Sequence, residues 1–134
     1  MPKLDHIGIA VNSIEEASRL YTGPLGLTLD HVETVREEDV RVGFLPLGGS
    51  ELELLEPIGG EGPLAKFLDK RGEGLHHICI DVEDLSSTME RLREQGARLL
   101  NQEPLRGARD RLVAFVHPLS ANGVLLELSQ KSRP

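Results

Sequence analysis

Four residues of this chain have the types and the spacing of a metal site. His6 and His77 lie 71 residues apart in two similar stretches, LDHIGIAV and LHHICIDV, where each is the polar member of an alternating apolar pattern. Glu53 and Glu127 each stand between two leucines in two further similar stretches, ELELL and VLLEL. Two imidazoles and two carboxylates suit a divalent transition-metal ion. The sequence therefore predicts a site to which each copy of an internal repeat contributes one histidine and one glutamate.

The chemistry of such a centre follows from its ligands. A divalent ion with two neutral imidazoles and two carboxylates keeps positions for water or substrate oxygens, and it acts as a Lewis acid on a carbonyl oxygen. Chelation of a 1,3-dicarbonyl or an α-hydroxycarbonyl compound would lower the pKa of the intervening C–H bond, because the enolate is stabilised. Proton abstraction next to a carbonyl is the reaction that these residues favour.

Other polar residues are less suited to the site. His76 has the opposite strand parity to its neighbour and is not predicted to be a ligand. Glu51 and Glu56 lie outside the repeat match, and we expect both to be solvated. His31 and His117 also have no counterpart, although His117 stands at a strand end from which it could reach the mouth of a cleft.

The elements that would position the four residues repeat as well. Each copy is predicted as βαβββ from its period-2 strands, capped helix and glycine turns. We expect strands at 4–11, 28–35, 41–47 and 51–56 with a helix at 14–22, a connector helix at 63–70, and then strands at 75–82, 98–103, 112–117 and 124–129 with a helix at 85–95. The predicted fold class is α+β, with two tandem βαβββ modules forming one strongly curved mixed sheet, helices outside and a metal-binding cleft inside. A single domain is expected over 1–134, with module one at about 3–57, the connector at 58–73 and module two at about 74–130.

The composition excludes several classes of partner. The 134-residue chain has a formal net charge of −7, which argues against nucleic acid and against an anionic membrane surface. Cys79 is the single cysteine, so no internal disulfide can form. We expect neither a leader peptide nor a membrane-spanning run, and a cytoplasmic protein is the prediction.

At these residues the chain resembles the vicinal oxygen chelate (glyoxalase-like) superfamily, and within it the methylmalonyl-CoA epimerases. GEGLHHI and the late HP with GVLLEL are the more specific stretches, and the resemblance covers nearly the whole chain. It implies a divalent ion, with cobalt expected and manganese, nickel or zinc as alternatives. It further implies interconversion of (S)- and (R)-methylmalonyl-CoA through a metal-stabilised enolate, and a homodimer is expected. The ligands that it implies are His6, Glu53, His77 and Glu127.

The resemblance also assigns proton transfer. Glu127 is implied as a base as well as a ligand, whereas glutamine replaces the residue equivalent to Glu53 in some relatives. Some bacterial relatives carry a second glutamate base where this chain has Val42. Nearby acidic residues could substitute if the chain curls over the cleft, namely Glu37, Glu38 and Asp39. Candidates for the phosphates of coenzyme A are Lys66, Arg71, Arg106, Arg109 and Arg111.

Three other functions fit parts of the pattern. A lactoylglutathione lyase (glyoxalase I) uses the same ligand logic on a hemithioacetal, but its usual aspartate-rich turn is replaced here by residues 117–123. An extradiol dioxygenase would leave Glu53 as an unexplained extra ligand. A metal-free small-molecule-binding module would not need four such ligands, and it tends to have an aromatic cleft, whereas this chain has no tryptophan and one tyrosine.

Overall fold

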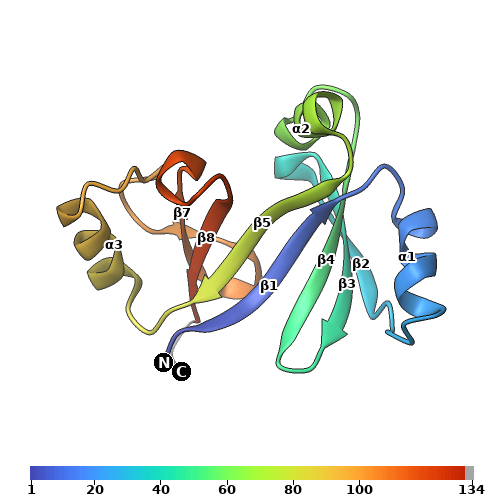
Figure 1. The fold of residues 1–134 in the computed structure, drawn as a ribbon, viewed down its shortest axis with the longest axis horizontal. Coiled ribbons are helices and arrows are strands. Elements are labelled where there is room, and N and C mark those ends of the chain that lie inside the picture. Colours follow the sequence, from blue (N-terminus) through green and yellow to red (C-terminus); the bar gives the residue numbers. More distant parts are fainter. Residues whose placement is uncertain (132–134) are drawn as a thin grey trace. The chain divides into compact units, whose positions relative to one another are not determined.

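The computed structural model describes residues 1–131, and the chain divides into two compact units. The first-repeat unit is His6–His76, and the second-repeat unit is Met1–Asp5 together with the chain from His77 onward. Each unit holds one copy of the predicted strand and helix pattern (Figure 1). Among the described residues, every helix is too short or too polar to cross a membrane.

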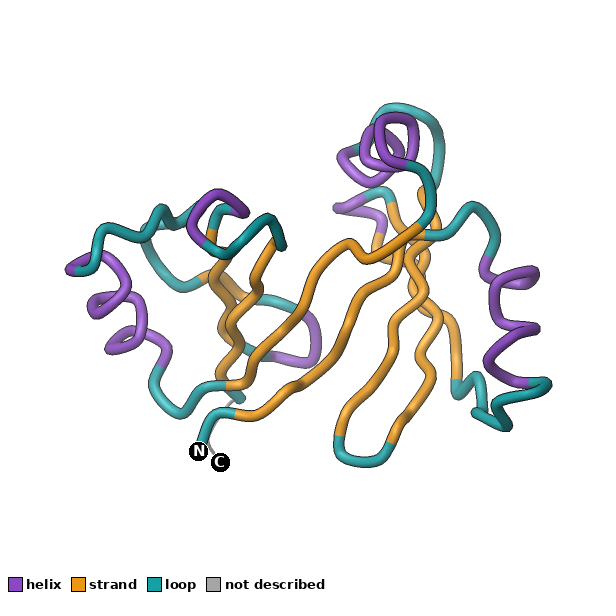
Figure 2. The backbone as a smooth tube through the Cα atoms, viewed as in Figure 1, coloured by secondary structure: helices purple, strands orange, loops and turns teal. Residues whose placement is uncertain are grey.

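The first-repeat unit carries three whole strands, the larger part of a fourth and two helices, and residues 3–5 of that fourth strand belong to the second-repeat unit. Its strand order is β2-β3-β4-β1, in which β1 runs parallel to β4 and the other neighbours are antiparallel. A two-glycine turn joins β3 to β4, visible as a tight loop between two long strands in Figure 2. The elements are β1 (Lys3–Ala10), α1 (Ile14–Thr22), β2 (His31–Val35), a 3₁₀ turn (Arg36–Glu38), β3 (Val40–Leu47), β4 (Ser50–Pro57) and α2 (Pro63–Arg71).

The second-repeat unit follows the same plan. Its strand order is β5-β8-β7-β6, with β5 parallel to β8 and the remaining neighbours antiparallel. The elements are β5 (Gly74–Asp81), α3 (Leu85–Glu94), β6 (Leu105–Arg106), a 3₁₀ turn (Ala108–Asp110), β7 (Leu112–Val116), a 3₁₀ turn (Pro118–Ser120) and β8 (Leu125–Gln130). Each copy therefore reads βαβββ, as the sequence predicts.

The strand predicted at 98–103 is wrong, and the reason is a side chain. Leu99 forms only an isolated bridge to Val116, and the next strand, β6, comes later. Asn101 occupies the place of a ladder residue, because its amide oxygen accepts from Phe115 N–H at 2.9 Å and its amide nitrogen donates to Val113 O at 3.3 Å. An asparagine side chain competes with the backbone ladder in this way.

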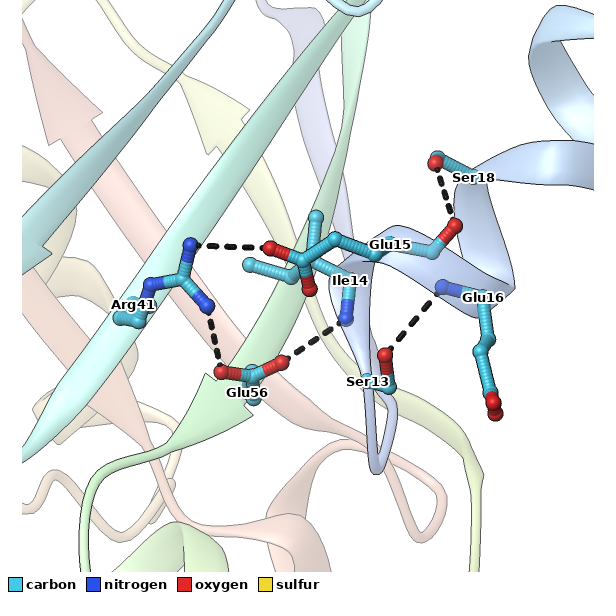
Figure 3. Close-up of polar contacts among 7 residues, drawn as sticks. All are labelled: Ser13, Ile14, Glu15, Glu16, Ser18, Arg41 and Glu56. Carbon is cyan, nitrogen blue, oxygen red and sulfur yellow. Dashed lines mark hydrogen bonds and ion pairs between the residues drawn. The ribbon is translucent and has the colours of Figure 1, made fainter.

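Both repeats tie a helix to their last strand through the same position. In the first repeat, Ile14 N–H at the start of α1 donates to Glu56 Oε1 at 2.9 Å, and Figure 3 shows that Arg41 donates to the other oxygen. In the second, Leu85 N–H donates to Gln130 Oε1 at 2.7 Å. These side chains satisfy helix N–H groups that have no partner within the helix. The expectation that Glu56 is merely solvated is therefore wrong.

The two faces of the first-repeat sheet carry different helices. On one face, Ile9, Leu52 and Leu54 pack with Val11, Leu45 and the α1 residue Ile14. The alternate residues Ala10 and Leu55 pack with Val42, Phe44 and the α2 residues Leu64, Phe67 and Leu68. The parity of Ala10 and Leu55 is that of His6 and Glu53. The connector helix α2 thus packs on the histidine face, contrary to the expectation that the helices lie only on the opposite one.

In the second-repeat unit, α3 covers one face only. Leu85 and Met89 of this helix are buried against Ala114, Val116 and Leu128. Cys79 and Glu127 are Cα partners on neighbouring strands and have the opposite parity to Leu128. The helix therefore packs on the side of the sheet away from the predicted ligands.

Candidate metal centre

The first predicted pair comes together on β1 and β4. His6 Nδ1 lies 3.4 Å from Glu53 Oε2, and the two side chains are only 10% and 14% exposed. The parallel register places Glu53 beside Gly8, two residues beyond the histidine on the same face. An imidazole and a carboxylate that are mostly removed from water need a partner or an ion, because burying an unpaired charge is costly.

The second pair has the same register on β5 and β8, although its contact is made by the other ring nitrogen of the histidine. His77 Nε2 lies 3.5 Å from Glu127 Oε1, with the side chains 11% and 16% exposed. Glu127 is the Cα partner of Cys79, again two residues beyond the histidine. On its other side each glutamate is the Cα partner of a phenylalanine, Phe44 for Glu53 and Phe115 for Glu127. The repeat is therefore exact in register as well as in sequence.

The pairs fit the ligand spacing of a transition-metal ion. Two donor atoms about 2.1 Å from one ion, at octahedral or tetrahedral angles, lie about 3.0 to 3.4 Å apart. The two measured N···O separations, 3.4 Å for His6–Glu53 and 3.5 Å for His77–Glu127, are close to that range. Each unit thus holds half of the predicted donor set in a spacing that an ion can bridge.

Two other histidines are used for packing or turns. The ring of His76 meets Phe67 of α2 edge-on, with centroids 4.9 Å apart, and burial lowers its pKa. His117 Nδ1 accepts a hydrogen bond from Leu119 N–H at 3.0 Å and so caps the 3₁₀ turn that follows. Neither contact resembles the two histidine–glutamate pairs.

The acidic residues suggested in place of Val42 lie at the end of the β2–β3 hairpin. Glu37 and Glu38 belong to the 3₁₀ turn, and Asp39 follows in the left-handed conformation, where its O accepts from Ile58 N–H at 2.8 Å. Val42 itself is buried, 7% exposed, among the apolar residues around α2. The valine side chain offers no proton chemistry.

Three further polar residues lie on β2 and just before it; the sequence does not single out Asp30 or Glu33, and it gives His31 no counterpart. In the antiparallel register, His31 is the Cα partner of Phe44, and Glu33 is the partner of Val42. Directly opposed residues point to the same side of a sheet, so both lie on the face of Glu53. Asp30 Oδ2 is 2.7 Å from His31 Nδ1. The only signal in the sequence was the alternation of His31 and Glu33 along a short strand.

Glu51 is also placed differently from expectation. It is half-buried and is the Cα partner of His6, so it shares the histidine face rather than standing free in solvent. Its counterpart in the second repeat is Leu125, the partner of His77. The two copies therefore differ in charge at this position while they agree at both predicted ligands.

The arginines considered for coenzyme A are partly engaged within the chain. Arg111 Nη1 lies 2.6 Å from Asp5 Oδ1, and the two side chains are 17% and 12% exposed. Arg106 pairs with Asp110, and Arg71 lies over the ring of Phe67 at 5.6 Å. Arg111 is thus part of a buried ion pair rather than a free surface charge.

Comparison with known proteins identifies the class to which this fold and these residue pairs belong. A family model of the Glyoxalase/Bleomycin resistance protein/Dioxygenase superfamily matches residues 5–115, and the chain belongs to this superfamily. Its relatives are more specific. The chain is 41% identical over 130 residues to the ethylmalonyl-CoA/methylmalonyl-CoA epimerase of Cereibacter sphaeroides, covering 96% of this chain and 97% of the relative. Within the superfamily, the chain belongs to the methylmalonyl-CoA epimerase family.

Solved structures agree with this placement. The methylmalonyl-CoA epimerase of Mycobacterium tuberculosis is 36% identical with a TM-score of 0.87, covering 97% of this chain and 88% of that one. A methylmalonyl-CoA epimerase in complex with methylmalonyl-CoA and NH4+ is 34% identical with a TM-score of 0.89, covering 98% and 96%. The predicted α+β fold class with tandem βαβββ modules and the predicted family are confirmed.

Proposed function

We propose that this protein is a metal-dependent epimerase that interconverts (S)- and (R)-methylmalonyl-CoA by removing and returning the proton at C2. The observation that carries the proposal is the pair of register-equivalent histidine–glutamate contacts, one in each unit of the chain. It is supported by the match to a relative named ethylmalonyl-CoA/methylmalonyl-CoA epimerase over 97% of that relative's length. This relative favours the epimerase over the lactoylglutathione lyase and over the metal-free binding module. A cytoplasmic homodimer remains the prediction for its location and assembly.

In this proposal one divalent ion is held by His6, Glu53, His77 and Glu127. Cobalt is the proposed ion, and manganese, nickel and zinc are alternatives that accept the same nitrogen and oxygen ligands. When bound, the ion would supply Lewis acidity to the thioester and carboxylate oxygens of the substrate and so lower the pKa of the C2–H bond. The side chains of the chain then have to hold the substrate and move the proton.

Glu127 is the proposed base for one enantiomer. Its carboxylate is mostly buried and lies between Cys79 and Phe115 in the sheet register, so few waters compete for the proton that it accepts. Glu53 has the equivalent place in the first repeat. Because some relatives replace that residue by glutamine, which cannot accept a proton, we assign proton transfer to Glu127 and only ligation to Glu53.

The test is isotope exchange at the reacting carbon. The protein is stripped of metal, reloaded with Co2+ and incubated with (S)- or (R)-methylmalonyl-CoA in deuterated water, and deuterium at C2 is measured by mass spectrometry. We expect metal-dependent exchange of both enantiomers, followed by racemisation. Absence of exchange in the metal-loaded protein, together with turnover of the methylglyoxal–glutathione hemithioacetal, would replace the epimerase by a glyoxalase.

A further inference from the structure

A second group of polar residues lies on the face of the sheet that carries Glu53. The register runs from His31 on β2 to Phe44 on β3 and then to Glu53 on β4, each the Cα partner of the next. Glu33 lies two residues beyond His31, opposite Val42. His31 and Glu33 therefore share the face of the predicted ligand Glu53 and lie on the edge strand of the sheet.

Contacts hold this group in one arrangement. His31 Nε2 lies 3.0 Å from Glu33 Oε1, and His31 Nδ1 lies 2.7 Å from Asp30 Oδ2. The imidazole also stacks on the Phe44 ring, with centroids 4.5 Å apart and planes 18° apart. The ring thus lies against the Phe44 side chain of β3, with the Glu33 carboxylate beside it. His31 and Glu33 remain accessible, with side chains 39% and 46% exposed.

The proposed reaction can use such a group. Inversion at C2 removes a proton from one face of the carbon and returns one to the other, which two acid–base groups on opposite faces can do. Glu127 is the proposed group for one face. Val42, the buried neighbour of Glu33, cannot serve the other.

Glu33 lies on the same face as the predicted ligand Glu53, nearer the edge of the sheet. Glu33 and Glu53 are separated by two strand spacings across the sheet and two residues along it, roughly 12 Å between Cα atoms. Both residues belong to the same face of the sheet, and Val42 and Phe44 of β3 lie between their strands on that face.

We propose that Glu33 is the second acid–base group of the epimerase, and that His31 is a positioning residue that also passes it a proton. The proposal rests on the epimerase function. As Glu127 takes the C2 proton of one enantiomer, the C–H electron pair moves into the enolate of the thioester. Glu33 relays the proton of the hydrogen-bonded His31 imidazolium to the opposite face of C2, the enolate electrons form the new C–H bond, and the exposed imidazole regains a proton from solvent. In the reverse direction Glu33 takes the proton and Glu127 returns it.

The experiment follows each enantiomer separately. Metal-loaded Glu33→Gln protein is incubated with (S)- or (R)-methylmalonyl-CoA in deuterated water, beside wild type and Glu37→Gln, a control that removes an exposed carboxylate from the hairpin end. We expect exchange of one enantiomer to fall by about 100-fold or more, while the other still exchanges through Glu127 and net epimerisation is lost. Glu37→Gln should behave as wild type, and Glu33→Asp should regain part of the lost exchange.

His31→Gln separates positioning from general stability. The variant should slow exchange of the same enantiomer as Glu33→Gln by about 10-fold and leave the other enantiomer within a factor of two. Equal slowing of both enantiomers, or wild-type exchange of both by Glu33→Gln, would overturn the inference. The wild-type control tests the proposed function separately. If wild type exchanges both enantiomers, the epimerase function is supported even when the role of Glu33 is overturned. If wild type exchanges neither, the epimerase function itself is contradicted.

Discussion

Glu56 accepts a hydrogen bond from Ile14 N–H at 2.9 Å, and this contact joins the first turn of α1 to the strand that carries Glu53 three residues earlier. Arg41 Nη1 donates to the second oxygen of the same carboxylate at 2.7 Å. Figure 3 shows how the carboxylate stands between the guanidinium and the start of the helix. The strand and the helix are therefore held together beside the candidate ligand.

Replacement of Glu56 by alanine should destabilise the fold. The loss of the acceptor for Ile14 N–H corresponds to a lost helix cap, about 1 kcal/mol in the free energy of unfolding. Glu56→Gln should cost less, because an amide oxygen accepts the same bond, as Gln130 does for Leu85 at 2.7 Å. Urea unfolding of the three metal-free proteins measures the difference, and equal stability of Glu56→Ala and wild type would show that the contact contributes nothing.

Metal binding should depend on both repeats. His6→Ala and His77→Ala should each lose the ion, since each removes one of four ligands, whereas His76→Ala, whose ring packs on Phe67, should retain it. Elemental analysis after dialysis gives the occupancy. Because coordination needs a neutral imidazole, wild-type occupancy should fall below about pH 6. Full occupancy in His77→Ala would contradict the assignment of the ligands.

Glu127→Gln should separate ligation from proton transfer. The amide oxygen can still coordinate, so we expect the variant to retain most of its metal, but it cannot accept a proton and should lose epimerisation by about 100-fold or more. Exchange of the enantiomer that relies on the other base should survive. Near wild-type epimerisation by a metal-loaded Glu127→Gln protein would remove this residue from the catalytic role.

His31 should make stability depend on pH. Hydrogen bonds to Asp30 and then to Glu33 raise the pKa of His31 above its usual value in the folded protein. A raised folded-state pKa stabilises the fold fully below the unfolded-state pKa, near 6.5, and this contribution is lost as pH rises through the folded-state value. The stability difference between wild type and His31→Gln should therefore be larger at pH 5.5 than at pH 9, as thermal unfolding can show. A difference that grows with pH would contradict the sign.

The substrate preference should follow the proposed chelate. Methylmalonyl-CoA and malonyl-CoA each offer a thioester carbonyl and a carboxylate that can close a six-membered ring on an ion, whereas propionyl-CoA offers the thioester alone. We expect malonyl-CoA to exchange its C2 protons in deuterated water and propionyl-CoA to exchange far more slowly. Comparable exchange of propionyl-CoA and malonyl-CoA would mean that the carboxylate is not recognised.

The alternation of polar and apolar residues along a strand was sufficient to predict which side chains share a face of the sheet. The parity of His6 among aliphatic neighbours and of Glu53 between leucines predicts their common face, and the structure adds that Gly8 and Glu53 are partners. The β2–β3 register depends on the turn at 36–39, where Asp39 adopts a left-handed conformation without a glycine signal. The pairing of Glu33 with Val42 could therefore not be predicted.

Other differences arise from interactions between segments distant in the sequence. Glu56 appears solvated by parity alone, because its partners Ile14 and Arg41 are 42 and 15 residues away. The packing of α2 on the histidine face depends on which side of the sheet the connector crosses. Asn101 forms hydrogen bonds to the backbone of β7 with its side chain, where a strand would use its own backbone. An alternating apolar pattern in the sequence gives no sign of such bonds.

The contact that ties the first helix of each repeat to its last strand is made by a different residue type in the two repeats. Glu56 in the first copy and Gln130 in the second both supply an oxygen to a helix N–H, although only one of them is charged. Three residues earlier, Glu53 and Glu127 have both kept a carboxylate. An amide thus stands in for a carboxylate where only a hydrogen-bond acceptor is needed, whereas the candidate ligand position is a carboxylate in both halves of the chain.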